Sequence, residues 1–203
     1  MNTGNKTRVR NFFRIVRKNR DDHSKIKKEL NRLLSIPEID INTQEYREYT
    51  LLHLVVRYND PLLIEMFIDA GVNIEISGNQ GDTPLHYGII KNKVEAVEKL
   101  IELGDDVNSC SECERTPLHH AVTYNRKDMI DILVKNGAYI DMADEQGMTA
   151  LHYAMEEKNY EIACKLLELG ADIFIEDYDG SSSYSVASNY EDKEFQELIQ
   201  KYS

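Results

Sequence analysis

A four-residue motif recurs in this chain every 33 residues, and it restricts the possible folds more than any other feature. The motif reads Thr-Leu-Leu-His, Thr-Pro-Leu-His, Thr-Pro-Leu-His and Thr-Ala-Leu-His, at residues 50–53, 83–86, 116–119 and 149–152. A degenerate copy of the motif, Ser-Ser-Tyr-Ser, follows at 182–185. A glycine keeps the same period, at Gly71, Gly104, Gly137 and Gly170. Because two markers share one period, the sequence predicts an array of similar supersecondary units.

The residues of one period describe a pair of short helices. Thr83 is a good N-cap, because its hydroxyl accepts a hydrogen bond from a backbone N–H that has no partner inside the helix. Pro84 then occupies the first helical position, where a missing N–H costs nothing. A second helix is indicated by apolar residues at helical spacing, Val94, Val97, Leu100 and Ile101. Gly104 suits the left-handed residue that ends a helix.

These motifs resemble the ankyrin repeat, a β-turn followed by two antiparallel helices, most strongly from about residue 44 to residue 178. The resemblance implies an all-α repeat solenoid, a stack of helix-turn-helix units joined by β-turn or hairpin loops. We expect four repeats, at residues 44–76, 77–109, 110–142 and 143–175. A basic helical N-terminal cap at 1–43 and a divergent C-terminal capping repeat at 176–203 complete the predicted array.

The two predicted caps follow from the physics of stacking. One repeat buries too little apolar surface to be stable alone, so repeats stack and the outer face of each end must be polar. In the N-terminal cap we expect a first helix that buries Val9, Phe12, Phe13 and Val16, and a second that carries Leu30, Leu33 and Leu34. In the C-terminal cap we expect Phe195, Leu198 and Ile199 on the buried side.

The repeated motif supplies a set of structural signature residues: Thr50, His53, Thr83, His86, Thr116, His119, Thr149, His152, Gly71, Gly104, Gly137 and Gly170. The resemblance implies that each signature histidine ties neighbouring repeats together by hydrogen bonds. A shared metal is the competing interpretation. One histidine per repeat places them too far apart for one metal ion, whose nitrogen ligands lie about 2 Å from it. We therefore expect no metal at the histidines.

Cys110 and Cys113 form a C-x-x-C motif in the turn between the second and third repeats. A zinc site would need two more ligands, for which His119 or His120 are the candidates, and a redox role would place the motif at a helix start after a strand. We expect two ordinary loop cysteines, with zinc and a reversible disulfide as open alternatives. No catalytic or phosphate-binding motif is present, so we expect no enzyme activity and no cofactor.

Composition and charge favour a soluble protein of a reducing compartment. The three cysteines are an odd number, and arginines interrupt any apolar core of a signal peptide. We expect an intracellular, cytoplasmic protein, with the nucleus or a host-cell cytoplasm as alternatives. Residues 1–35 hold 11 Lys and Arg against 3 Asp and Glu, whereas the other 168 residues hold 13 against 33. The basic helix at 8–20 therefore suggests an alternative function, that of an adaptor targeted to a membrane surface or to the nucleus.

The resemblance implies a binding role, because ankyrin proteins usually hold a partner protein in a concave groove formed by the β-turn tips and the first helices. The matching positions predict partner-binding residues: Tyr46, Arg47, Tyr49, Arg57, Tyr58, Gln80, Asp82, Lys91, Arg115, Tyr124, Met148, Glu157 and Tyr178. Six of the chain's 12 tyrosines, namely the five of this set and Tyr190, occupy groove positions, and Tyr and Arg are enriched at interface hot spots. The charge of these positions changes from basic in the first repeat to acidic in the last.

We therefore expect a non-catalytic protein-protein interaction module that binds another protein and masks or scaffolds it. We expect no further domain after the cap at 176–203, which favours masking over recruitment, and we expect a monomer because the caps are polar. Nucleic acid is an unfavourable partner for the acidic body, and no small-molecule substrate is expected. The frequent Lys, Asn, Ile and Glu are typical of an AT-rich genome, so an effector of an intracellular bacterium or a large DNA virus is one possible source.

Overall fold

The computed structural model describes residues 3–43, 49–190 and 193–202. Within these ranges the chain forms twelve α-helices and two short 3-10 turns, and the only extended pairing is an isolated bridge between Glu176 and Ser182. The predicted all-α repeat solenoid is therefore confirmed. The chain divides into two compact units, residues 1–106 and 107–203.

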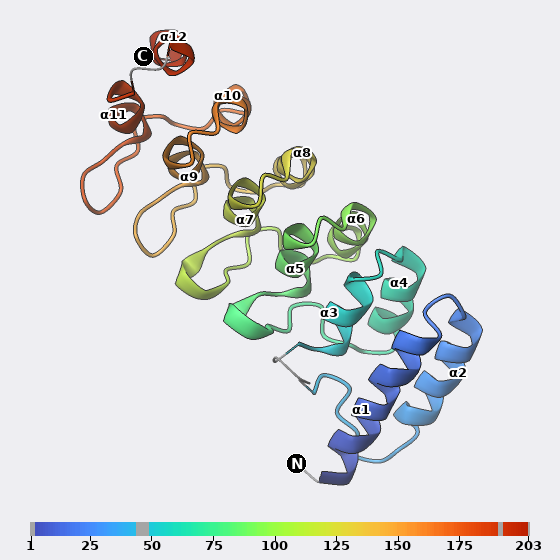
Figure 1. Cartoon of the computed structure of the whole chain (residues 1–203). Helices are drawn as coiled ribbons and strands as arrows, with labels where there is room; N and C mark the ends of the chain where they lie inside the picture. The colour runs from blue at the N-terminus through green and yellow to red at the C-terminus, as the bar shows by residue number, and fades with distance from the viewer. Residues whose placement is uncertain (1–2, 44–48, 191–192, 203) are drawn as a thin grey trace. The chain divides into compact units, whose positions relative to one another are not determined.

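The first unit contains three helical hairpins, which Figure 1 shows in blue to green. Its elements are α1 (Thr3–Lys18), α2 (His23–Leu34), α3 (Leu51–Val56), α4 (Pro61–Asp69), η2 (Asn79–Gly81), α5 (Pro84–Ile90) and α6 (Val94–Glu102). Each odd-numbered helix packs on the helix that follows it. In addition, α3 packs on α5 and α4 packs on α6, so first helices and second helices form two rows.

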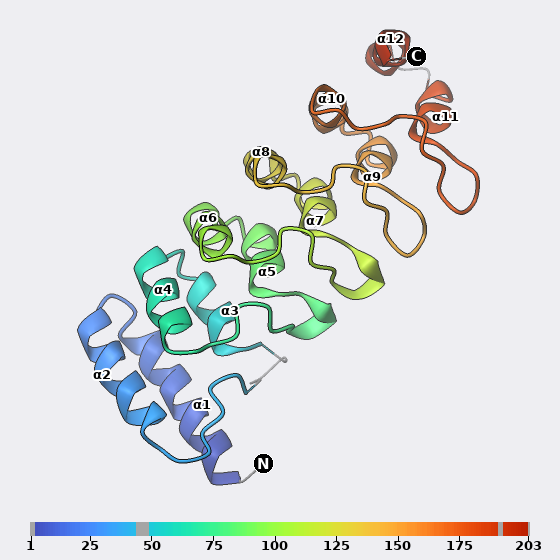
Figure 2. The ribbon, with the colours of Figure 1, turned by 180° about the vertical axis from the view of Figure 1, so that it is seen from behind.

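The second unit repeats this arrangement. Its elements are η3 (Glu112–Glu114), α7 (Pro117–Thr123), α8 (Lys127–Lys135), α9 (Ala150–Glu156), α10 (Tyr160–Glu168), α11 (Ser183–Ser188) and α12 (Lys193–Tyr202). The loops that precede α9 and α11 project from the same side of the unit, and the view from behind shows the same (Figure 1, Figure 2). Loop tips and first helices of neighbouring repeats are thus exposed side by side.

Hydrogen bonds of the signature histidines join one repeat to the next. The Nδ1 atom of His53 accepts the backbone N–H of Thr50 at 3.3 Å, as His119 accepts that of Thr116 at 3.1 Å. Because Nδ1 is an acceptor, the ring proton must be on Nε2. His53 Nε2 donates to the Asp82 carbonyl at 3.0 Å. His119 donates to the Met148 carbonyl at 3.0 Å, and His152 donates to the Ser181 carbonyl at 3.2 Å.

This geometry requires the neutral form of the ring. Burial lowers the pKa of His53 to about 4 and lowers that of His119 in the same direction. Protonation would place a hydrogen on Nδ1, which faces the N–H and hydroxyl of the capping threonine. The threonine and histidine of the motif therefore cap the start of the first helix. The same histidine ring also binds the loop of the next repeat.

The N-terminal cap has a longer first helix than the repeats. Over its 16 residues, α1 buries the four predicted side chains, Val9, Phe12, Phe13 and Val16. Phe12 approaches Phe67 of α4 with ring centroids 6.0 Å apart. Leu34 was predicted to lie with Leu30 and Leu33 on the buried side. That prediction is wrong, because Leu34 is the last residue of α2 and its side chain is exposed.

The C-terminal cap closes the second unit with α12, which contacts α10 and α11. Phe195 and Leu198 are buried, as predicted. The Phe195 ring receives two edge contacts, from Tyr160 at 5.6 Å and Tyr190 at 5.1 Å between centroids. Aromatic pairs of this geometry are favourable beyond their buried area. The degenerate C-terminal repeat thus retains a packed interior although its Thr-Pro-Leu-His motif is lost.

One buried carboxylate breaks the pattern of the repeats. Asp105 follows Gly104 and is only 5 % exposed, whereas the equivalent position holds Val72, Ala138 and Ala171 in the other repeats. Within the described part of the chain, neither of its carboxylate oxygens accepts a hydrogen bond of ordinary geometry, and the backbone N–H of Asp106 stabilises the charge only in part. Burial raises the pKa of Asp105 to about 7, and the negative charge of Glu75 adds to the rise. The folded chain therefore holds this proton more tightly than the unfolded chain does.

Candidate protein-binding surface

In the first unit, the described candidate residues occupy the ends of short helices. Tyr46 and Arg47 lie outside the described residues. Arg57 and Lys91 are exposed C-cap residues, of α3 and α5 respectively. Gln80 is an exposed residue of the loop tip η2, and Tyr49 and Tyr58 are half-buried. Five of the predicted residues are thus at least partly accessible in this unit.

Three aromatic rings form a cluster beneath Arg57. The Tyr49 ring lies 5.1 Å from that of Tyr87 and 5.4 Å from that of His53, and His53 lies 5.7 Å from Tyr87. Tyr87 was not among the predicted residues. It directly follows the signature His86, and Tyr153 follows His152 in the same way, so the recurrence of a tyrosine after the motif was the available signal.

In the second unit, the loop tips are held by a carboxylate that the motif search missed. Asp144 Oδ1 accepts the backbone N–H groups of Gln146 at 2.9 Å and Met148 at 3.0 Å. In the next loop, Asp177 Oδ1 binds the N–H groups of Asp179 and Ser181 at 2.9 and 2.8 Å. Both aspartates stand three residues before a glycine and 33 residues apart, a periodicity that could have revealed them.

Neighbouring loop tips of this unit are also bonded to each other. The Glu145 N–H donates to the Cys113 carbonyl at 3.1 Å, and the Tyr178 N–H donates to the Gln146 carbonyl at 3.0 Å. Gly147 allows this close approach, because a Cβ there would lie 2.8 Å from both the ring and the backbone nitrogen of Tyr178. The tips therefore form a rigid platform, fixed along the stack by main-chain bonds.

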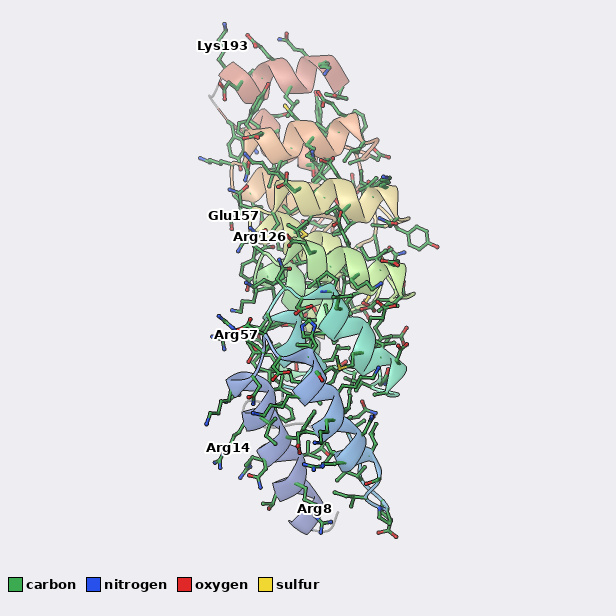
Figure 3. The ribbon with its side chains drawn as sticks, turned by 90° about the vertical axis from the view of Figure 1, so that its right-hand side faces the viewer. Arg8, Arg14, Arg57, Arg126, Glu157 and Lys193 are labelled. Atoms are coloured by element: carbon green, nitrogen blue, oxygen red, sulfur yellow. The ribbon has the colours of Figure 1, made fainter. Side chains whose placement is uncertain are left out.

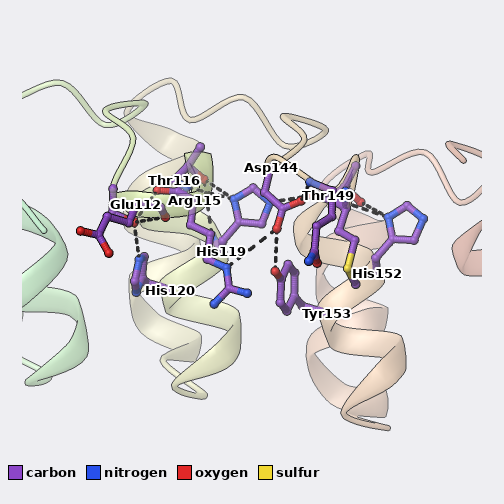
Figure 4. Close-up of polar contacts among 12 residues, drawn as sticks. Glu112, Arg115, Thr116, His119, His120, Asp144, Thr149, His152 and Tyr153 are labelled. Carbon is purple, nitrogen blue, oxygen red and sulfur yellow. Dashed lines mark hydrogen bonds and ion pairs between the residues drawn. The ribbon is translucent and has the colours of Figure 1, made fainter. Parts of the chain in front are cut away.

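Arg115 takes part in a polar cluster that Figure 4 shows at the base of these loops. The Tyr153 hydroxyl donates to Asp144 Oδ2 at 2.6 Å, and Arg115 Nε lies 3.8 Å from the same oxygen. The Arg115 guanidinium also stands 5.0 Å from the centre of the Tyr153 ring. Burial and the hydrogen bond to Asp144 raise the pKa of Tyr153 well above its usual value. Arg115, predicted as a partner contact, is therefore half-buried and already engaged.

Three other predicted residues of this unit are exposed. Tyr178 is 79 % exposed and Tyr124 is 42 % exposed, and Glu157 is an exposed C-cap residue of α9. The Tyr124 ring stacks on His120, with centroids 6.2 Å apart and planes 6° apart. The backbone of each tyrosine is fixed by hydrogen bonds. These side chains are the most accessible part of the predicted surface.

Two predicted partner contacts need correction. Asp82 and Met148 are the residues directly before the capping threonines, and they are only 5 % and 9 % exposed. Their carbonyl oxygens accept the bonds from His53 and His119. Their side chains are buried and do not present a surface to a partner. Position in the repeat alone did not reveal this difference.

The cysteines lie on exposed loops. Cys110 and Cys113 are exposed and Cys164 is half-buried, and all three are free thiols. A hydrogen bond with Glu145 raises the pKa of Cys113, which keeps its thiol protonated. Of the proposed zinc ligands, His119 uses both ring nitrogens and His120 bonds Ser111 at 3.0 Å. Within the described ranges, no group of three or more His, Cys, Asp or Glu side chains is placed to hold a metal ion.

The basic helix α1 has its apolar side already buried. Val9, Phe12, Phe13 and Val16 are in the core of the cap, so a membrane-bound helix would have to unfold the cap first. Its arginines are exposed, and Arg14 projects from the same edge of the first unit as Arg57 (Figure 3). In the described chain, no helix has the length and apolar character that a membrane crossing requires.

Comparison with known families agrees with this geometry. A family model described as ankyrin repeats (3 copies) matches residues 23–111 and 92–177, which is most of the chain. The chain belongs to the ankyrin-repeat family. Ankyrin repeats are generally protein-protein interaction modules and typically have no enzymatic activity, so a protein partner is expected for this one. A search among curated proteins gave no match.

Proposed function

We propose that this ankyrin-repeat protein binds one partner protein through its loop tips and first helices, and that it masks or scaffolds that partner without catalysis. The observation that carries the proposal is the exposure of Tyr178 and Tyr124 at positions whose backbone is held by hydrogen bonds. Tyrosine buries a large area with few rotatable bonds and keeps a polar hydroxyl, which makes it a frequent hot-spot residue.

The scaffold reduces the entropic cost of such binding. The Tyr178 backbone is bonded to Gln146, and its ring lies against Gly147. Tyr124 is the C-cap residue of α7, where its N–H bonds the His120 carbonyl at 2.9 Å. Because these backbones are ordered before a partner arrives, less freedom is lost on association. A flexible loop with the same residues would bind more weakly.

The surface of the second unit is negatively charged, and a partner must complement that charge. The exposed carboxylates near the candidate tyrosines are Glu145, Glu156, Glu157 and Asp179. Residues 107–203 hold 8 Lys and Arg against 19 Asp and Glu. A partner with basic residues at this point would associate faster and in one orientation. The three free thiols fit an intracellular, cytoplasmic setting, which is part of the proposal.

The proposal is tested by affinity capture from cell lysate, with three immobilised forms of the protein. They are the wild type, the double variant Tyr124→Ser with Tyr178→Ser, and the control Tyr139→Ser with Phe174→Ser. The control removes two exposed aromatic rings that lie outside the predicted set. The three forms are used only after their thermal unfolding curves are shown to coincide.

We expect proteins that the wild type and the control retain and that the Tyr124/Tyr178 variant loses. Their identification by mass spectrometry names the partner. Equal retention by all three forms would contradict the proposed surface. Loss by the control alone would move the interaction to the Tyr139 and Phe174 side chains.

A further inference from the structure

We propose that the first unit carries a docking site for a short acidic segment of the partner protein, centred on Arg57. The site comprises Arg17 of α1, Arg57, Lys91 and Lys93, with Tyr49 and Tyr87 as its aromatic wall; we call it the Arg57 site. The inference rests on the proposed function, protein binding, and adds the chemistry of what is bound. It lies in the first unit, whereas Tyr124 and Tyr178 belong to the second.

Two hollows meet at Arg57 and Tyr87. The inner one has a volume of about 50 Å³ and is lined by Phe13, Arg17, Tyr49, His53, Leu54, Arg57 and Tyr87. The outer one has about 440 Å³ and is lined by Arg57, Tyr87, Lys91 and Lys93. The inner volume fits roughly three water-sized groups, about the size of a carboxylate. The outer hollow has room for the peptide backbone of the partner segment that carries this carboxylate.

The cations of the Arg57 site have no carboxylate partner. Among the described residues, Arg17, Arg57, Lys91 and Lys93 form no ion pair within 4.0 Å. Lys91 instead stands 5.7 Å from the centre of the Tyr87 ring. By contrast, Lys99 of the same unit pairs with Glu65 and Glu102, each at 3.2 Å. In the described part of the chain, none of these four cations is therefore neutralised by an ion pair.

This positive charge affects the pKa values of the neighbouring tyrosines. Burial raises the pKa of Tyr58, and Arg17, Arg57 and Arg20 act against that rise, because each stabilises a phenolate. Burial likewise raises the pKa of Tyr87, and Arg57 opposes it. Among the described residues, Glu95 is an acidic side chain near the site, and its pKa is lowered first by a hydrogen bond from Asn59, then by a backbone hydrogen bond, and also by Lys93. Its carboxylate accepts a hydrogen bond from the Asn59 side chain.

These features select an acidic peptide rather than a long polyanion. Guanidinium groups bind carboxylates in a planar, two-bond geometry, and aromatic walls favour a peptide over water. Residues 1–106 are nearly neutral, with 16 Lys and Arg against 17 Asp and Glu, and residues 107–203 are strongly acidic. A nucleic acid that extended beyond the site would meet this negative charge, whereas a segment with a few carboxylates would not.

The experiment uses the full chain and a fluorescein-labelled peptide of eight residues, in which four glutamates alternate with four glycines. Its binding is followed by fluorescence anisotropy at low salt. A second peptide replaces every glutamate with glutamine. A five-nucleotide single-stranded DNA, with four phosphates, serves as the charge-matched nucleic acid. The site variant is Arg57→Ser with Lys91→Ser. Its control, Lys27→Ser with Lys28→Ser, removes the same charge from exposed positions of α2.

We expect the acidic peptide to bind wild type at least tenfold more tightly than the glutamine peptide. The site variant should lose at least about fivefold in affinity, and the control should stay within twofold because it keeps the site intact. Binding should weaken as salt screens the charges. Equal losses in both variants would show a general charge effect and overturn the site, as would absent peptide binding.

Tighter binding of the DNA than of the acidic peptide, with the same dependence on Arg57 and Lys91, would overturn the peptide proposal in favour of nucleic acid. Failure of the Arg57 site and failure of the tyrosine surface give different results. Peptide binding can fail while lysate capture still depends on Tyr124 and Tyr178, in which case only the Arg57 site is wrong. The reverse result would leave the Arg57 site standing and would refute the tyrosine surface.

Discussion

Replacing Asp105 with alanine should stabilise this protein, and the gain should grow with pH. The carboxylate is buried without a hydrogen bond of ordinary geometry among the described residues, at a position where other repeats place Val72, Ala138 or Ala171. Alanine keeps the Cβ and removes only the group that is costly to bury. Most substitutions of buried residues destabilise, so a gain would be informative.

The magnitude follows from the pKa of Asp105, which rises from 3.8 to about 7 on folding. A folded pKa above the unfolded value means that the native state binds the proton more tightly, so stability is lost as pH rises between the two values. Burial of this titrating group then costs about 4 kcal/mol at pH 8, about 2 kcal/mol at pH 5.5, where the folded state is protonated and the unfolded state is not, and little below about pH 4. Asp105→Ala should recover amounts of this order.

Urea unfolding at several pH values measures this gain as a difference between variant and wild type. The difference is needed because His53 and His120, each with a pKa of about 4, titrate in the same window with the opposite sign. Their stabilisation is lost as pH falls from 6.5 to 4, and it cancels in the comparison. Asp105→Asn is the control, since it keeps the shape and removes only the titration. A gain that does not change with pH would refute the reasoning, as would a less stable alanine variant at pH 8.

Three further substitutions test the described contacts by urea unfolding at pH 7. His119→Ala should cost about 3 kcal/mol, because the Thr116 N–H and the Met148 carbonyl lose their partner in a buried place; a loss below about 1 kcal/mol would refute the link between repeats. Tyr153→Phe should cost about 1–3 kcal/mol because buried Asp144 loses its 2.6 Å hydrogen bond, and an unchanged midpoint would contradict that role. Gly147→Ala should cost about 1–2 kcal/mol, since its φ is 79° and the new methyl would overlap Tyr178; wild-type stability would show that the loop tips are not packed.

The fold was predictable because its information is local and repeated. Thr83, Pro84 and Gly104 set the beginning and end of helices by backbone chemistry alone, and the same residue types recur every 33 positions. The caps were predictable from their apolar spacing, apart from Leu34. That residue has the right spacing but lies at the end of α2, where no neighbour covers it.

The candidate surface was less predictable, because exposure depends on contacts between repeats. Asp82 and Met148 share their repeat position with Tyr49 and Arg115, yet the first two are buried. Arg17 was missed because it belongs to the cap and reaches the Arg57 site only through the packing of α1. Asp144 was missed because the search followed the Thr-Pro-Leu-His motif, although its 33-residue spacing from Asp177 was a usable signal.

The central claim is that the exposed tyrosines of the loop tips and first helices touch a partner protein. Photo-crosslinking tests it most directly, with p-benzoylphenylalanine placed singly at Tyr178, Tyr124 or Tyr139 and irradiated in cell lysate. Tyr139 is 69 % exposed but lies outside the predicted set, so it controls for accessibility. We predict one common adduct from positions 178 and 124 and none from 139. An adduct from 139 alone, or none from 178 and 124, would contradict the account.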